Sequence, residues 1–351
     1  MTAAGLDRDG TPRDAPRGDE SPRGQESRAG SHPEDVVIGR LAARLGRGRV
    51  RAIRHALILV GLVSLPYIVA INAATSLFGF DAHAYWNVNL GNLYGSATGN
   101  TSDLDAFRYT PAAGQLFAVF HAVPWELFFA IWFAAMIGAL IWLTGWSTLV
   151  LLAFPPIPLE LYHGNIHLFI AVAIVIGFRY PAAWAFVVLT KVTPGVGALW
   201  FAFRGEWRKF GIAVGATVAI AAGSLVVAPD LWRQYVSTMV DNLDYDPGHP
   251  YPIPIPLPIR MLASVGIVWW GARTDRRWAV PVAATLSLPI IWFHGFAVLV
   301  AAIPLWWDDR ARARQRDRQA VGTASGDPPR SAERRLVDVA QAASGRNSIG
   351  A

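Results

Sequence analysis

Long apolar segments separated by short polar ones fill the middle of the chain. The first, from Ala56 to Phe80, carries no charge and is long enough to cross a bilayer, because a helical span needs about 20 apolar residues. Further apolar segments follow at about 112–124, 125–146, 147–161, 165–178, 181–203, 210–228, 255–271, 278–293 and 294–307. The pattern predicts an all-α, polytopic transmembrane helical bundle with about eight to ten membrane helices.

Several of these segments are too short for a full span, and prolines interrupt others. Pro155 and Pro156 break one segment, and Pro194 breaks another. Broken helices at membrane depth occur where they line a cavity inside the protein. Between Gly145 and Arg204 we therefore expect either four crossing helices or a pair of half-helices that enters the membrane and returns.

Charge distribution supports the membrane interpretation. Hydrophobic residues make up 53% of the chain and charged residues only 16%, whereas soluble proteins carry about a quarter charged residues. Arginines flank the span ends, as between Arg40 and Arg54, and such residues stay on the cytoplasmic side. The basic balance is thus explained by topology, and no nucleic-acid partner is expected. Both termini are expected in the cytoplasm of a multi-pass cell-membrane protein.

Polar composition at the two ends predicts three regions. Residues 1–54 are expected to form a disordered, arginine-rich cytoplasmic tail, residues 55–307 the transmembrane domain, and residues 308–351 a second disordered cytoplasmic tail. With the first tail inside, residues 79–110 and 229–253 form outer loops. The chain has no cysteine, which excludes disulfides and thiolate metal sites.

Asp81 stands directly after the first span, at the expected outer membrane surface, with Tyr85 close behind it. A carboxylate shielded there by aromatic rings and lipid would have a raised pKa. It could serve as a general base toward a hydroxyl at the interface. The alternative is a solvated aspartate that only ends the helix.

Lys191 lies inside an otherwise uncharged run from Ala182 to Phe203. A lysine near the bilayer centre costs roughly 2.5–3.5 kcal/mol to insert, so we expect an interior partner. A lipid phosphate or a buried acid would offset this cost. The alternative is a lysine whose ammonium reaches the membrane interface.

Two further polar groups are candidates for binding. His163, Asn165 and His167 form a polar turn between two apolar runs. Histidines four apart could bind a metal on a helix, but hydrogen bonding to a sugar or phosphate is the stronger interpretation, and a plain connecting loop is an equal alternative. Arg108, beside Tyr109, could grip a phosphate or pair with a nearby aspartate. We expect no metal ligand set, and the need for a divalent ion stays open.

The order of several short motifs resembles glycosyltransferase family 87 of the GT-C superfamily, over about residues 56–240. The matching positions are Asp81, Tyr85, Leu93-Tyr94, Phe107, Tyr109, Pro111, Gly164-Asn165, Lys191-Val-Thr193-Pro194 and Arg204-Gly-Glu-Trp207-Arg208. The resemblance implies a polyprenyl-phosphate-mannose-dependent α-mannosyltransferase that needs no cofactor and acts on the extracytoplasmic face.

On this resemblance Asp81 would deprotonate an acceptor hydroxyl of a cell-envelope lipid or glycan. Attack at the anomeric carbon of the transferred hexose would invert the configuration of that carbon. Lys191, with help from Arg108 or a histidine, would stabilise the departing polyprenyl phosphate. A non-enzymatic transporter or flippase of lipid-linked sugars is the alternative, with Lys191 in a translocation site. Membrane lipids, the donor and the acceptor are the expected partners.

Overall fold

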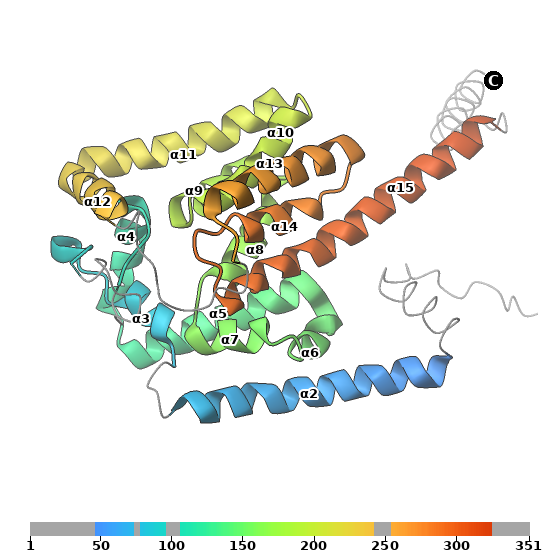
Figure 1. Ribbon diagram of the computed structural model, residues 1–351, viewed down its shortest axis with the longest axis horizontal. Helices are drawn as coiled ribbons and strands as arrows, with labels where there is room; N and C mark the ends of the chain where they lie inside the picture. The colour runs from blue at the N-terminus through green and yellow to red at the C-terminus, as the bar shows by residue number, and fades with distance from the viewer. Residues whose placement is uncertain (1–45, 74–77, 96–105, 242–253, 325–351) are drawn as a thin grey trace, which may run out of the picture. The chain divides into compact units, whose positions relative to one another are not determined.

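The computed structural model describes residues 46–73, 78–95, 106–241 and 254–324. The chain divides into two units, Met1–Val50 and Arg51–Ala351, and the second contains nearly all of the described residues. Every regular element in the described part is helical (Figure 1). The prediction of an all-α fold is confirmed.

The elements follow one another with short connections. In chain order they are α2 (Arg47–Ala73), α3 (Phe80–Trp86), η1 (Leu90–Asn92), α4 (Pro111–Phe117), η2 (Ala118–Ala122), α5 (Trp125–Thr144), η3 (Gly145–Ser147), α6 (Thr148–Leu151), α7 (Pro156–His163), α8 (His167–Gly177), η4 (Pro181–Ala183), α9 (Trp184–Thr190), η5 (Thr193–Ala198), α10 (Leu199–Phe203), α11 (Trp207–Val227), α12 (Pro229–Asp241), α13 (Leu257–Thr274), α14 (Ala279–Leu286), η6 (Phe293–Ala301) and α15 (Ala302–Ala324).

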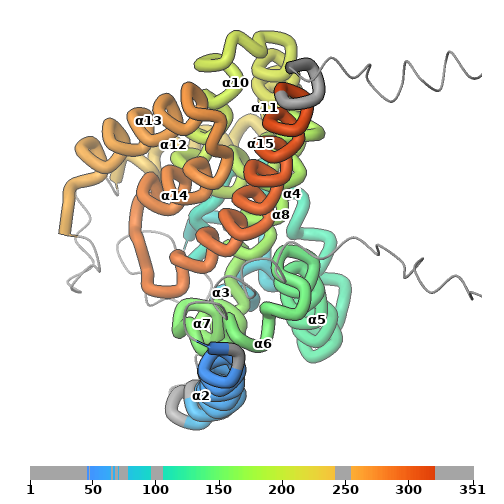
Figure 2. The backbone as a smooth tube through the Cα atoms, turned by 90° about the vertical axis from the view of Figure 1, so that its right-hand side faces the viewer, coloured from blue at the N-terminus to red at the C-terminus, as the bar shows by residue number. Residues whose placement is uncertain are grey.

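The core lies where α8, α14 and η6 meet. Ile170 and Ile174 of α8, Val280 of α14 and Val298 of η6 are fully buried. Small residues allow close packing: the ring of Trp184 lies directly against Gly177 and Gly197. Helix α8 packs against α9, α14 and η6. Figure 1 labels α9 and α14 close to α8, and Figure 2 shows the same helices turned by 90°. This core holds the ends of α7 and η6 in fixed positions beside α3.

The outer helices expose apolar side chains. Ile131 and Trp142 of α5, and Val218 and Val226 of α11, are all more than half exposed. Within the described part, Trp125–Leu151 and Trp207–Val227 are long and apolar enough to cross a membrane, and the α7–α8 pair would be a third if it counts as one span. A bilayer would cover these apolar surfaces, so the chain is a membrane protein; eight to ten spans stays a prediction.

The breaks expected between Gly145 and Arg204 are present. Helices α7 and α8 meet at an angle of 110°, which makes them a broken span or a re-entrant pair. Gly164 ends α7 with a φ of 69°, a left-handed conformation that favours glycine. The second break falls at Lys191, which has an extended backbone between α9 and η5, with Pro194 at the start of η5.

Two predicted boundaries differ from the structure. The first disordered tail was expected to reach residue 54, but α2 begins at Arg47, and the second was expected to begin at 308, but α15 continues to Ala324. Both segments are arginine-rich continuations of apolar helices, and arginine is a good helix former. The predicted first span ends earlier than expected, since Phe80 already belongs to α3. The remaining tail residues lie outside the described part.

Candidate active site

Asp81 lies in the first turn of the short helix α3. Gly79 precedes the helix with a φ of 73°, and its N–H donates to the Tyr162 carbonyl of α7 at 2.9 Å. Ala82 packs against Gly164, where an added Cβ would come within 2.7 Å of the Ala82 Cβ. The start of α3 is thus fixed directly against the turn between α7 and α8.

The Asp81 carboxylate faces polar side chains from two other elements. Its Oδ2 lies 3.9 Å from His294 Nε2, and it accepts a hydrogen bond from the Asn165 side chain. The Asn165 amide nitrogen is also 3.3 Å from His294 Nε2, which fits an N–H donated to a neutral imidazole. The Asp81 side chain remains 25% exposed, so a substrate can reach a carboxylate that the protein also holds in place.

Burial changes the acidity of Asp81, which lies outside the membrane-capable helices. Desolvation raises the pKa of this carboxyl above its ordinary value of 3.8. The nearby His163 imidazole, the Asn165 hydrogen bond and the Lys191 charge act in the opposite direction, and Glu160 adds to the rise. A carboxylate with a raised pKa is a better general base than a solvated one.

Glu160 connects the polar turn to α8. This carboxylate is fully buried, and its Oε1 accepts the backbone N–H groups of His167 at 2.7 Å and Leu168 at 3.3 Å. These two N–H groups belong to the first turn of α8, which has no partner for them within the helix. Glu160 Oε2 accepts from His167 Nδ1 at 3.0 Å, which orients that imidazole. One carboxylate thus caps α8 and fixes His167.

Lys191 brings a positive charge to the same region. Its charge interacts with both Asp81 and Glu160, and its Nζ lies 5.5 Å from the centre of the Tyr109 ring. The Tyr109 hydroxyl is 2.7 Å from the buried Tyr85 hydroxyl. The Tyr109 carbonyl accepts from Tyr94 at 2.8 Å, which holds the segment in place. Among the described residues no acceptor hydrogen-bonds the Lys191 ammonium, so it is available to an anion.

The structure brings most of the predicted site residues together. Asp81, Asn165, His163 and His167 meet around His294, whose ring lies 5.0 Å from that of His163 and 5.4 Å from that of His167. Lys191, Tyr109 and Tyr85 form the adjoining part. Arg108 is half-buried beside Tyr109, and its role toward phosphate stays a prediction.

Sequence reasoning missed two members of this cluster. Glu160 was not among the predicted site residues, although an acid between apolar runs is itself a signal of function. His294 was absorbed into the apolar segments 278–293 and 294–307. A single histidine at the junction of two apolar segments was the available signal, but nothing in the sequence places it beside Asp81.

A metal could be held only by the cluster of Glu160, His167 and His294, judged on the described residues. Their ligand atoms lie within 4.8 Å of one another, and two imidazoles with one carboxylate suit several transition metals. However, both Glu160 oxygens already accept hydrogen bonds, and the positive charge of Lys191 is close. Both features disfavour a metal cation at this cluster. His163 and His167 do not form a helical pair, because the chain turns between them.

An all-helical membrane protein with this cluster beside a broken helix pair is equipped for proton transfer and anion binding. The family model for glycosyltransferase family 87 matches residues 107–325. The match covers more than half of the chain, so the chain belongs to this family and is a membrane glycosyltransferase. Tyr109, Asn165, Lys191 and His294 lie within the matched segment, and Asp81 precedes it. No curated protein and no solved structure matches the chain.

Proposed function

We propose that this glycosyltransferase transfers a hexose, most simply mannose, from a polyprenyl-phosphate donor to a hydroxyl of a cell-envelope lipid or glycan on the extracytoplasmic face. The observation that carries the proposal is the position of Asp81. Its carboxylate is reachable, has a raised pKa, and is held by Asn165 beside His294 and near an available ammonium.

In the proposed reaction Asp81 accepts the proton of the acceptor hydroxyl as its oxygen attacks the anomeric carbon. The bond from that carbon to the phosphate oxygen breaks, and the electron pair leaves with the phosphate. Attack from the side opposite the leaving group inverts the anomeric configuration. One carboxylate suffices because the phosphate departs as a stable anion, whereas glycoside hydrolysis usually needs a second carboxyl as acid.

Lys191 is proposed to bind the donor phosphate. Its Nζ lies near the Tyr109 ring, and its charge interacts with the Asp81 and Glu160 carboxylates. In the described part of the chain, no acceptor takes a hydrogen bond from this ammonium. In this apolar setting an ammonium is strongly stabilised by an anion bound beside it, such as the donor phosphate. The charge that develops on the departing phosphate would strengthen this contact in the transition state.

The test is transfer of radiolabelled mannose from polyprenyl-phosphate mannose to lipid acceptors by membranes that contain the protein. Product formation that depends on Asp81 supports the enzyme proposal. Movement of the donor between leaflets without any new glycosidic bond would instead favour the flippase alternative. Family membership supports the enzyme over the carrier.

The proposed orientation places both termini in the cytoplasm, with Asp81 on the outer side. Since the chain has no cysteine, single Asn92→Cys and Thr274→Cys variants can be labelled without background. Both positions are exposed. A membrane-impermeant thiol reagent should label the Asn92→Cys variant in intact cells and the Thr274→Cys variant only after permeabilisation. The reverse pattern would reject the orientation.

A further inference from the structure

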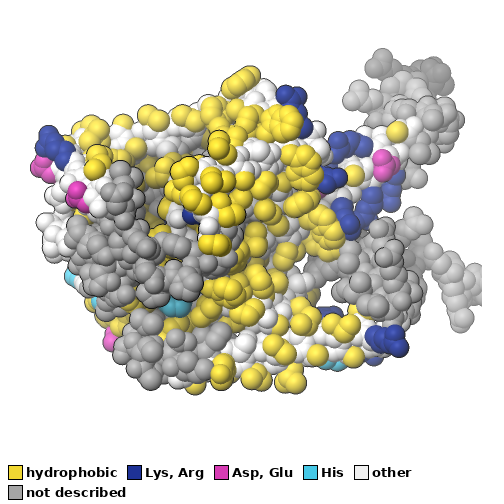
Figure 3. Space-filling view, viewed as in Figure 1, with side chains coloured by type: hydrophobic (Ala, Val, Ile, Leu, Met, Phe, Trp, Pro, Cys, Tyr) yellow, Lys and Arg dark blue, Asp and Glu magenta, His cyan; other side chains and the backbone are white. Residues whose placement is uncertain are grey.

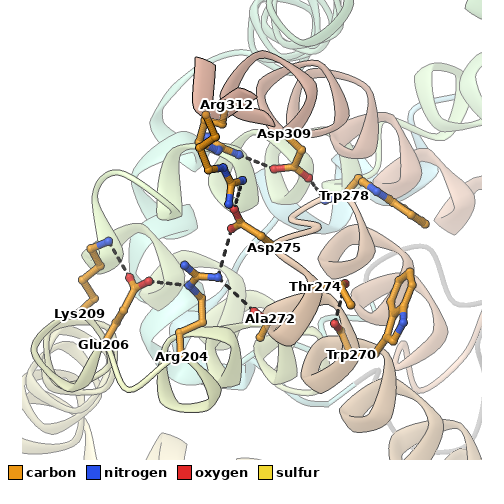
Figure 4. A network of polar contacts seen from close by, with 11 residues as sticks. Arg204, Glu206, Lys209, Trp270, Ala272, Thr274, Asp275, Trp278, Asp309 and Arg312 are labelled. Atoms are coloured by element: carbon orange, nitrogen blue, oxygen red, sulfur yellow. Dashed lines mark hydrogen bonds and ion pairs between the residues drawn. The ribbon is translucent and has the colours of Figure 1, made fainter. Parts of the chain in front are cut away.

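A network of ion pairs joins α15 to two helix connections, α10–α11 and α13–α14 (Figure 4). Arg204, before α11, donates to Glu206 at 2.8 Å and to Asp275 of the α13–α14 turn at 3.1 Å. Asp275 also pairs with Arg316 of α15. The network therefore links Arg316 of α15, through Asp275, to the residues that directly precede α11.

The network lies at one end of a membrane-capable helix. Helix α11 is one of the membrane-capable helices and begins at Trp207, directly after the network residue Glu206. Two more tryptophans at this end carry guanidinium groups over their rings, Arg276 over Trp270 at 4.8 Å and Arg310 over Trp306 at 3.6 Å. Tryptophan is enriched where a membrane meets water. The charged part of α15 thus begins beside a side chain of the type that lies at a membrane interface.

Positive charge at this end exceeds what the ion pairs use. The segments 204–209, 273–277 and 308–318 contain eleven basic residues and five acidic ones. The pairs engage Arg204, Lys209, Arg312 and Arg316. Basic side chains along α15 are visible in the space-filling view (Figure 3). Basic residues outnumber acidic ones in these segments by six, so net positive charge remains when every acid is counted.

Arg310, Arg314 and Arg318 form what we call the α15 stripe. They are four residues apart and therefore lie on one side of the helix. Arg314 and Arg318 are exposed, and no ion pair joins them to another described residue. Like charges at this spacing repel one another and destabilise a helix. An external anion would remove that repulsion.

We propose that the α15 stripe binds the anionic headgroups of the surrounding membrane, a surface of phosphodiester lipids rather than a soluble phosphate. Juxtamembrane basic residues gain attraction from an anionic leaflet, and this attraction fades within a Debye length. Arg310 lies over the Trp306 ring, and Arg314 and Arg318 follow about one and two turns further along α15. The inference is independent of the transfer reaction, because no stripe residue is among the groups that surround Asp81.

The test uses the purified full-length protein in a neutral detergent. Binding of phosphatidylglycerol, phosphatidylcholine and inorganic phosphate is measured for the unaltered chain and for the R314Q/R318Q variant. Both side chains are exposed, so the variant should fold normally, which size-exclusion chromatography checks. We expect the unaltered chain to prefer phosphatidylglycerol, and the variant to bind it roughly tenfold or more weakly.

Two controls make the result specific. The R314K/R318K variant keeps the charge and should retain binding, and the Arg233→Gln variant removes an exposed arginine from α12 and should bind like the unaltered chain. Equal phosphatidylglycerol affinity in the R314Q/R318Q variant would overturn the proposal. Equally tight binding of inorganic phosphate or of phosphatidylcholine would overturn it too.

Discussion

His294 Nε2 lies 3.9 Å from the Asp81 carboxylate, and Asn165 hydrogen-bonds to both side chains. The three residues come from η6, α3 and the turn between α7 and α8, so the arrangement exists only in the folded chain. The Asn165 amide holds the carboxylate in one orientation, and the His294 ring lies beside it. This relationship is the basis for the predictions on acidity, donor binding and geometry.

The first prediction concerns pH. Asp81 must be ionised to act as a base, so activity falls as the pH drops through its raised pKa. The Asn165 hydrogen bond favours the ionised form, and the Asn165→Ala variant therefore has a still higher pKa. We expect the acidic limb of its kcat/KM profile at higher pH than in the unaltered enzyme.

Other charged and titratable groups also lie around Asp81, and they allow comparison variants for this shift. They are His163, Lys191, Glu160 and His294, and Lys191→Gln should move the limb in the same direction because it removes a positive charge. A substitution in an exposed ion pair of α12, Arg233→Gln, should leave the acidic limb in place. An acidic limb that stays fixed in the Asn165→Ala variant would mean that another group controls the profile.

The second prediction concerns the donor. Replacing Lys191 with glutamine removes a charge-assisted contact to phosphate, worth about 1.5–3 kcal/mol. We expect kcat/KM for the polyprenyl-phosphate donor to fall roughly 10- to 150-fold, with Lys191→Arg recovering part of it. The only other lysine, Lys209, pairs with Glu206. Lys209→Gln is thus the matched control, and an equal loss in both variants would reject the phosphate role.

The third prediction concerns the contact between Gly164 and α3. Alanine at this position is strained by the φ of 69°, and its Cβ would lie 2.7 Å from the Ala82 Cβ. We expect Gly164→Ala to displace α3 and with it Asp81. A 1 Å displacement of a reacting group can cost about 100-fold in rate, so transfer should fall strongly in the radiolabel assay.

Gly138 provides the matched control for that substitution. It lies within α5, and an added Cβ there would have open space. Gly138→Ala should retain transfer. Normal transfer by the Gly164→Ala variant would show that the position of α3 tolerates displacement or that Asp81 is not the base.

The fourth prediction concerns Glu160. Its removal in Glu160→Ala leaves the N–H groups of His167 and Leu168 and the His167 ring without their acceptor. Each unsatisfied buried group costs about 1–3 kcal/mol. The thermal midpoint in detergent should therefore fall clearly. Glu160→Gln keeps one acceptor oxygen and should lose less; equal midpoints for the two variants would contradict the capping role.

The sequence was sufficient to predict the residues that depend on local pattern. Asp81 directly follows an apolar run, Lys191 is the one charge in another, and Gly164 with its polar neighbours interrupts a third. Each stands out because a membrane segment tolerates few polar residues. The helical fold class follows from the same constraint, since a chain in lipid must satisfy its own backbone hydrogen bonds.

Contacts between distant segments could not be predicted in this way. His294 meets Asn165 only because η6 packs against α7 and α8. The capping role of Glu160 depends on the 110° bend, which has no local signature beyond glycine and polar residues. The length of α15 was underestimated because its charged half resembles a polar tail in composition. The Arg316–Asp275 ion pair and the hydrogen bond from the Trp278 N–H to Asp309 hold this helix against the α13–α14 turn.

The most direct test of the central claim is transfer by the Asp81→Asn variant. Loss of a general base costs about 10²–10⁴-fold in rate, so mannose transfer from polyprenyl-phosphate mannose should fall by at least about 100-fold. Because burial raises the pKa of Asp81, its ionised form opposes folding near neutral pH. The variant should therefore be at least as thermally stable as the unaltered protein.

Glu126 is an exposed acid in the first turn of α5, and Glu126→Gln serves as the control. The account predicts that membranes with Glu126→Gln form product normally, while membranes with an equal amount of folded Asp81→Asn protein form almost none. Undiminished transfer by the Asp81→Asn variant would contradict the account, because the carboxylate would then have no part in the reaction.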